Sequence, residues 1–141
     1  SPAVQEVAKD ILAGHDRIHL IEPLDVFDFH NLASRSYFIM TDSGGVQEEA
    51  PSLGKPVLVL RDTTERPEGV RAGTLKLVGT DPVCVKEAMA ALLTDETLYG
   101  QMSQAPNPYG DGKASERIVR AIQHYFGMAE SVSEFKEGEE A

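Results

Sequence analysis

The sequence predicts an α/β protein built on a parallel sheet, and three observations support this class. Short apolar segments alternate with amphipathic ones along most of the chain, as strands and helices do in such sheets. Residues 57–60 are apolar at every position, which is typical of a strand covered on both faces. The 141 residues are enough for one domain with its own core.

The first part of the chain predicts two helices with a short strand between them. Pro2 and Gly14 bound the first helix, over residues 2–13, because proline suits the first helical turn and glycine the end. Residues 17–21 are expected to form a strand and residues 25–33 a second helix. Apolar side chains at helical spacing are expected to pack inward, namely Val4, Val7, Ala8, Ile11 and Leu12, then Val26, Phe29, Leu32 and Ala33.

The remainder predicts three strands and four helices. The strands are expected at residues 37–41, 57–60 and 74–78, with a polar loop over 61–73. The helices are expected at residues 45–50, where Pro51 sets the limit, and at 82–93, 95–103 and 114–126, with a turn-rich loop over 105–112. The last helix is expected to pack inward through Ile118, Val119, Ile122, Tyr125 and Phe126.

Composition and charge exclude several classes of protein. The net charge of −10 argues against a nucleic-acid-binding surface. No apolar run approaches the roughly 18 residues of a membrane span. The single cysteine, Cys84, fits a reducing cytoplasm and lies on an amphipathic helix, where a packing role is expected. Residues 129–141 are acidic and poor in apolar side chains, so they are interpreted as a disordered tail.

Residues 38–49, with the sequence FIMTDSGGVQEE, carry the strongest functional signal. An apolar strand gives way to Ser43, Gly44 and Gly45, which open a helix. A helix start offers unpaired N–H groups and partial positive charge, and glycines let a ligand approach the backbone closely. The pattern predicts a site for the phosphates of a nucleotide or nucleotide-sugar. The alternative is an ordinary turn in which Asp42 or Ser43 caps the helix.

Two further features lie at the same predicted edge of the sheet. Glu48 and Glu49 are adjacent on a helix and so diverge by about 100°; one is expected to face solvent and the other, Glu49, the site. The loop at residues 61–68 contains arginines that can bind a phosphate, or it can be a surface cluster of ion pairs. The four histidines lack metal-ligand spacing, and no dinucleotide or ATP-binding motif is present, so neither metal nor cofactor is expected.

Three segments together resemble a known family. Residues 42–56 (DSGGVQEEAPSLGKP), 57–67 (VLVLRDTTERP) and 107–112 (NPYGDG) resemble the C-terminal domain of non-hydrolysing UDP-N-acetylglucosamine 2-epimerases, within a match over about residues 1–127. These enzymes interconvert UDP-N-acetylglucosamine and UDP-N-acetylmannosamine by eliminating and re-adding UDP. The resemblance implies a glycosyltransferase-B architecture, in which two Rossmann-like domains enclose the ligand.

The resemblance also implies which residues bind the ligand. It places residues 1–128 in a UDP-binding Rossmann-like domain that lacks its first strands, in keeping with a chain that begins on a helix. It implies no metal, no nicotinamide, a homodimer when full length, and catalytic residues that have no counterpart in this chain. The implied contacts are Phe29 with uracil, Ser43, Gly44 and Gly45 with diphosphate, Glu49 with ribose, and Arg66 with the nucleotide-sugar.

Two other functions remain open at this point. A chain without catalytic residues can be a non-catalytic module that binds nucleotide-sugars. It can also be the C-terminal half of a glycosyltransferase, which shares a glutamate that binds ribose.

Overall fold

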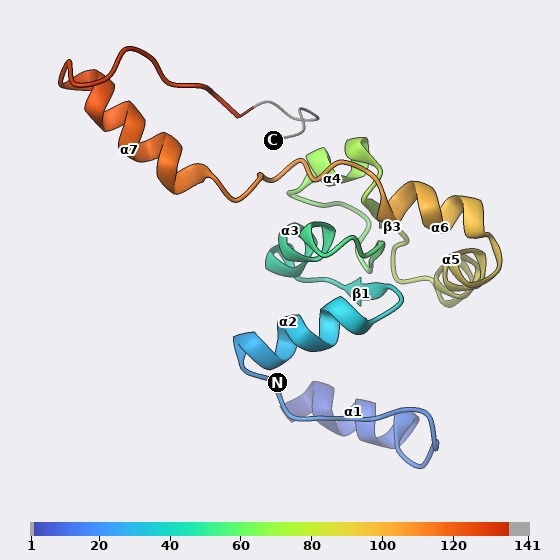
Figure 1. Ribbon diagram of the computed structural model, residues 1–141. Coiled ribbons are helices and arrows are strands. Elements are labelled where there is room, and N and C mark those ends of the chain that lie inside the picture. The colour runs from blue at the N-terminus through green and yellow to red at the C-terminus, as the bar shows by residue number, and fades with distance from the viewer. Residues whose placement is uncertain (1, 136–141) are drawn as a thin grey trace. The chain divides into compact units, whose positions relative to one another are not determined.

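The structure is a computed structural model that describes residues 2–135. These residues divide into two compact units, one ending at Asn31 and the other beginning at Leu32, and each is described by itself (Figure 1). Helix α2, Val26–Arg35, crosses the boundary. In the part of the chain described, no helix is long and apolar enough to span a membrane.

The first unit contains helix α1, Pro2–Leu12, in agreement with the sequence. Gly14 follows with φ 85°, the left-handed conformation that ends a helix. The strand expected at residues 17–21 is absent, because within residues 2–135 the only sheet has three strands and none of them lies there. A strand needs a neighbour for its backbone hydrogen bonds, and without one the segment stays irregular.

The apolar stripe of α1 does not pack inward. Val4, Val7 and Ile11 are 66%, 57% and 65% exposed, and in α2 Val26 and Leu32 are also exposed whereas Ala33 is buried. The expectation of inward packing was therefore wrong for these side chains. Amphipathic spacing shows that a helix has an apolar face, but the surface that covers this face must come from elsewhere.

The second unit is built on a parallel sheet, as predicted. Strands β1 (Ile39–Thr41), β2 (Val57–Val59) and β3 (Leu75–Leu77) lie in the order β1-β2-β3. Met40 pairs with Leu58, and Leu58 with Lys76. All three residues of β2 are 0% exposed, which confirms that this strand is covered on both faces.

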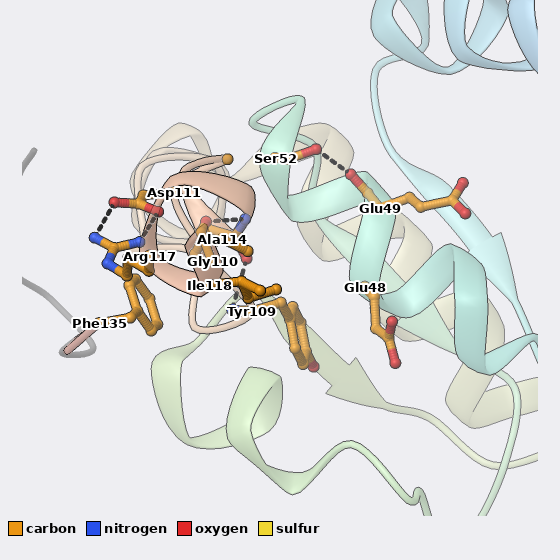
Figure 2. Close-up of a pocket in the computed structure, with 12 residues that line it drawn as sticks. Glu48, Glu49, Ser52, Tyr109, Gly110, Asp111, Ala114, Arg117, Ile118 and Phe135 are labelled. Carbon is orange, nitrogen blue, oxygen red and sulfur yellow. Dashed lines mark hydrogen bonds and ion pairs between the residues drawn. The ribbon is translucent and has the colours of Figure 1, made fainter. Parts of the chain in front are cut away.

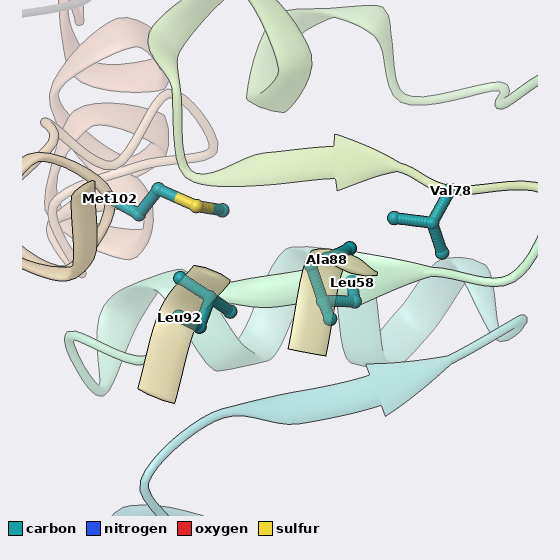
Figure 3. Packing of buried hydrophobic residues seen from close by; sticks show 5 residues of the cluster. All are labelled: Leu58, Val78, Ala88, Leu92 and Met102. Carbon is teal, nitrogen blue, oxygen red and sulfur yellow. The ribbon is translucent and has the colours of Figure 1, made fainter. Parts of the chain in front are cut away.

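Helices cover the two faces of β2 through alternate side chains. Leu58 packs with residues of α5 (Pro82–Thr94) and α6 (Glu96–Ser103), in a cluster completed by Val78 (Figure 3). Val57 and Val59 face the other way and pack with Ala50 of α3 (Gly44–Ser52) and with Tyr109. The start of α3 is thereby fixed beside the carboxyl end of β1.

Three local expectations were wrong in the second unit. Helix α4, Pro67–Ala72, occupies part of the segment expected to be a loop; it has proline in its first turn and left-handed Gly73 at its end. Helix α3 continues through Pro51 to Ser52, because a proline this close to the last turn removes only one backbone hydrogen bond. Cys84 is exposed and does not pack in the core.

The last helix, α7, spans Ala114–Tyr125, as predicted, but its apolar face is not buried. The exposed side chains are Ile118, Val119, Ile122, Tyr125 and Phe126. Residues 129–135 contain neither helix nor strand, and residues 136–141 of the predicted tail lie outside the described residues.

Candidate functional site

The site begins where β1 passes into α3. Ser43 is the N-cap residue, and its backbone N–H donates to Thr41 Oγ1 over 3.0 Å. Its own side chain makes no capping hydrogen bond, so the alternative of a turn capped by Ser43 is not supported. The first N–H groups of a helix have no partner within it, and here they belong to the two glycines. Both the hydroxyl and the backbone donors of this turn are therefore available to an anion.

The two glycines mark where predicted site residues converge. A Cβ on Gly45 would lie 3.9 Å from Glu49 Oε1 and 3.9 Å from Ser43 Oγ. A Cβ on Gly44 would lie 2.5 Å from Glu65 Oε1 and 3.8 Å from Arg66 Nη2. Any side chain on Gly44 would therefore displace the charged groups that gather at the helix start.

Arg66 reaches this point from the loop after β2. Its Nε donates to Glu48 Oε1, and its Nη1 donates to the Glu65 carbonyl over 3.2 Å. The side chains of Arg66 and Glu48 are 32% and 42% exposed, so a ligand can reach the guanidinium. Glu48 was expected to face solvent if Glu49 faced the site, but it pairs with Arg66 because the loop lies beside α3.

Glu65 and Arg61 form a second ion pair in this loop. Arg61 Nη1 lies 2.7 Å from Glu65 Oε2, and both side chains are exposed. The pKa of Glu65 is lowered, first by a hydrogen bond from its own backbone N–H; desolvation opposes this, and the charges of Arg61 and Arg66 lower the pKa further. The loop therefore places a carboxylate and two guanidinium groups near the start of α3.

A buried amide connects α3 to this loop. The Thr64 hydroxyl donates to Gln47 Oε1 over 2.6 Å, and the same hydroxyl accepts a hydrogen bond from the Arg66 backbone N–H over 3.0 Å. Gln47 is 0% exposed, and its Nε2 has no hydrogen-bond partner within residues 2–135. A buried donor without a partner lowers the stability of the fold by about 1–3 kcal/mol, so the Gln47 amide is destabilising at this position.

A hollow lies beside α3. Glu48 and Glu49 line it together with Tyr109, Arg117 and Phe135, and Figure 2 shows the two glutamate side chains diverging, as their adjacency predicted. The Tyr109 hydroxyl accepts a hydrogen bond from the Gly69 backbone N–H over 3.1 Å, and burial raises the pKa of Tyr109. The loop at residues 107–112 is thereby attached to α4, which directly follows Arg66.

An ion pair holds the start of α7 beside this hollow. Arg117 Nη1 and Nη2 donate to the two carboxylate oxygens of Asp111, each over 2.7 Å. The hydrogen bonds from Arg117 keep the pKa of Asp111 far below its usual range. The Arg117 guanidinium also lies 5.7 Å from the centre of the Phe135 ring. These contacts stabilise the conformation of residues 107–117.

Five of the six predicted site residues lie around the start of α3, namely Ser43, Gly44, Gly45, Glu49 and Arg66. Phe29 belongs to the first compact unit, and its contact with uracil stays a prediction. Sequence reasoning missed Gln47 and Thr64. The available signal was that Gln47 shares a helix face with buried Ala50, which makes it a polar residue on an apolar face.

Fold and site together define a class of protein. A glycine turn at the carboxyl end of a parallel strand, with an arginine beside it, is the arrangement that receives the phosphates of a nucleotide in α/β domains. Within the described residues, no group of His, Cys, Asp and Glu side chains could hold a metal ion.

Comparisons with known proteins define the class more narrowly. The sequence model of the family described as UDP-N-acetylglucosamine 2-epimerase matches residues 1–123. This chain belongs to that family. The UDP-N-acetylglucosamine 2-epimerase of Bacillus subtilis (strain 168) is 64% identical over 127 residues, which are 90% of this chain and 33% of that protein.

Solved structures of relatives agree in fold. A structure of S. aureus MnaA with UDP superposes with a TM-score of 0.90 at 64% identity, over 96% of this chain and 38% of that one. The UDP-N-acetylglucosamine 2-epimerase of Neisseria meningitidis, bound to UDP-N-acetylglucosamine, gives a TM-score of 0.83 at 49% identity, over 88% and 33%. The chain therefore spans about a third of the length of the relatives it matches.

Proposed function

We propose that this chain is the UDP-binding portion of a UDP-N-acetylglucosamine 2-epimerase. The observation that carries the proposal is the convergence of Ser43, the two glycines and Arg66 at the start of α3. The family match supports UDP as the nucleotide, and two related structures were determined with UDP or UDP-N-acetylglucosamine bound.

In this proposal the diphosphate lies over the start of α3. The N–H groups of Gly44 and Gly45 donate to its oxygens, and Arg66 supplies a positive charge from the opposite loop. As the bond between sugar and diphosphate breaks, negative charge grows on the UDP leaving group. Preorganised donors and a guanidinium stabilise that charge more than they stabilise the bound substrate, and so they lower the barrier.

Glu49 is proposed to accept hydrogen bonds from the ribose hydroxyls. Its carboxylate lies near Gly45, one helical turn from the proposed diphosphate position. Phe29 is proposed to hold the uracil. The groups that move the proton at carbon 2 are proposed to lie in a further part of the enzyme. The enzyme is proposed to function as a homodimer in the cytoplasm. The UDP-binding domain is proposed to end at residue 128.

The proposal is tested with the full-length epimerase that carries this chain. NMR measures the conversion of UDP-N-acetylglucosamine to UDP-N-acetylmannosamine, and calorimetry measures UDP affinity. Glu49→Gln keeps the shape of the side chain but weakens its acceptor, so we expect a loss of affinity for UDP of about tenfold. The matched control is Glu96→Gln, on α6 and away from the site. Equal UDP affinity in the Glu49→Gln variant and the unmodified enzyme would contradict the ribose assignment.

A further inference from the structure

We propose that Gln47 and Thr64 act as a positioning pair, which holds Arg66 beside the start of α3 in the geometry that a nucleotide diphosphate requires. The inference rests on the proposed function and adds two residues to it, neither of which is expected from a glycine turn or an arginine alone. These residues act through Arg66, and their effect is on the free energy of UDP binding.

The hydrogen bonds run in one direction, with donation from the Arg66 backbone to Thr64 and from Thr64 to Gln47 on the helix. Gln47 Oε1 accepts from the Thr64 hydroxyl over 2.6 Å, which fixes the direction of the hydroxyl proton. The lone pairs of Thr64 Oγ1 are then oriented to accept from the Arg66 backbone N–H over 3.0 Å. Arg66 is therefore attached to the same helix whose start receives the diphosphate.

The backbone of Arg66 is also held from its other side. Pro67 is the first residue of α4, and Arg66 is the N-cap of that helix. The Gly69 N–H of α4 donates to the Tyr109 hydroxyl over 3.1 Å, which attaches α4 to a partly buried ring. With both neighbours fixed, the guanidinium loses less conformational freedom when it binds an anion, and affinity rises for that reason.

The burial of Gln47 argues that the pair does not serve stability alone. A leucine of similar size at this position would remove the unpartnered Nε2 from the interior. Gln47 packs on the same side of α3 as Ala50, where an apolar side chain is the ordinary choice. The hydrogen bond to Thr64 is the feature of Gln47 that a leucine could not reproduce.

The first test compares two variants of Thr64 in the full-length epimerase. Thr64→Val removes the hydroxyl and keeps the shape, whereas Thr64→Ser keeps the hydroxyl. We expect Thr64→Val to weaken UDP binding about fivefold, as the loss of one ordinary hydrogen bond would, and Thr64→Ser to restore most of the affinity. Unchanged UDP affinity in Thr64→Val overturns the inference.

The second test asks whether the pair acts through Arg66. Thr64→Val is combined with Arg66→Ala, and UDP affinity is measured for both single variants and the double variant. We expect Thr64→Val to have no further effect once Arg66 is absent. If it weakens binding equally in both backgrounds, the positioning role is wrong while the proposed function stands. If the Arg66→Ala variant itself binds UDP normally, the result contradicts the proposed function, and the positioning role with it.

The third test separates positioning from folding. Gln47→Leu is expected to keep or raise the melting temperature, because it removes the orphaned donor, and yet to weaken UDP binding as Thr64→Val does. A Gln47→Leu enzyme that melts normally and binds UDP normally contradicts the inference. If this variant fails to fold, the Thr64 variants decide the question, because Thr64 lies on a partly exposed loop.

Discussion

Replacing Arg66 by alanine should weaken UDP binding by about 10- to 30-fold. A hydrogen bond to a charged group contributes about 1.5–3 kcal/mol, and each 1.4 kcal/mol is tenfold in affinity. The Arg66 side chain is 32% exposed, so solvent screening favours the lower end of that range. The loss also leaves the Glu48 carboxylate without its partner near a diphosphate, which adds repulsion and extends the effect beyond tenfold.

The assay is calorimetric titration of the full-length epimerase with UDP, with the melting temperature recorded for every variant. The matched control is Arg71→Ala, because Arg71 is 69% exposed and its contact with Glu68 is a loose one of 3.6 Å. A double variant, Arg66→Ala with Glu48→Gln, should recover part of the lost affinity by removing the repulsion. A folded Arg66→Ala enzyme that binds UDP within twofold of the unmodified enzyme would refute the reasoning.

Two further predictions concern ionisable groups outside the proposed contacts. The thiol of Cys84 has a raised pKa, caused first by its hydrogen bond with Asp81 and then by the charge of that carboxylate. Alkylation of Cys84 at pH 8 should therefore be slow, and Asp81→Asn should accelerate it, because asparagine removes the charge and can still cap α5. Equal alkylation rates in the two proteins would contradict this prediction. The pKa of Asp111 is lowered by Arg117, so its contribution to stability is fully present above the ordinary carboxyl pKa of about 3.9, begins to fall as the pH drops through that value, and is lost only below the lowered pKa of the folded state. The difference in melting temperature between the unmodified chain and Asp111→Asn should therefore be largest at pH 7 and should shrink progressively as the pH is lowered through the ordinary carboxyl pKa and beyond it, and a difference independent of pH would contradict the assignment.

The sequence was most informative where structure depends on neighbours along the chain. The apolar run at residues 57–60 and the glycines at 44 and 45 predicted the buried strand and the turn after β1, because strand burial and helix starts leave local signals. Helix α4 escaped prediction because it has only six residues, one of them glycine, in a polar surrounding. Short helices depend on their tertiary contacts more than on their intrinsic propensity.

Features that depend on distant contacts could not be predicted in the same way. Gln47 and Thr64 are 17 positions apart, and nothing in the local pattern of either segment indicates that they meet. The stripe of α1 was recognised correctly as apolar, yet its exposure depends on which surface lies against it. Periodicity identifies a face, whereas burial is a property of two faces together.

The full burial of β2 has a consequence for how a ligand leaves. Its three residues are 0% exposed, so their amide hydrogens should exchange with solvent only when the second unit unfolds as a whole. The loop at residues 61–68 begins two residues after the strand ends, and its Arg61–Glu65 ion pair is exposed. The Arg61–Glu65 ion pair can therefore open in a local fluctuation that costs little free energy, while Thr64 stays bonded to Gln47 and the sheet stays closed. Release of a bound nucleotide would then be governed by this local opening, on a timescale far shorter than that of global unfolding.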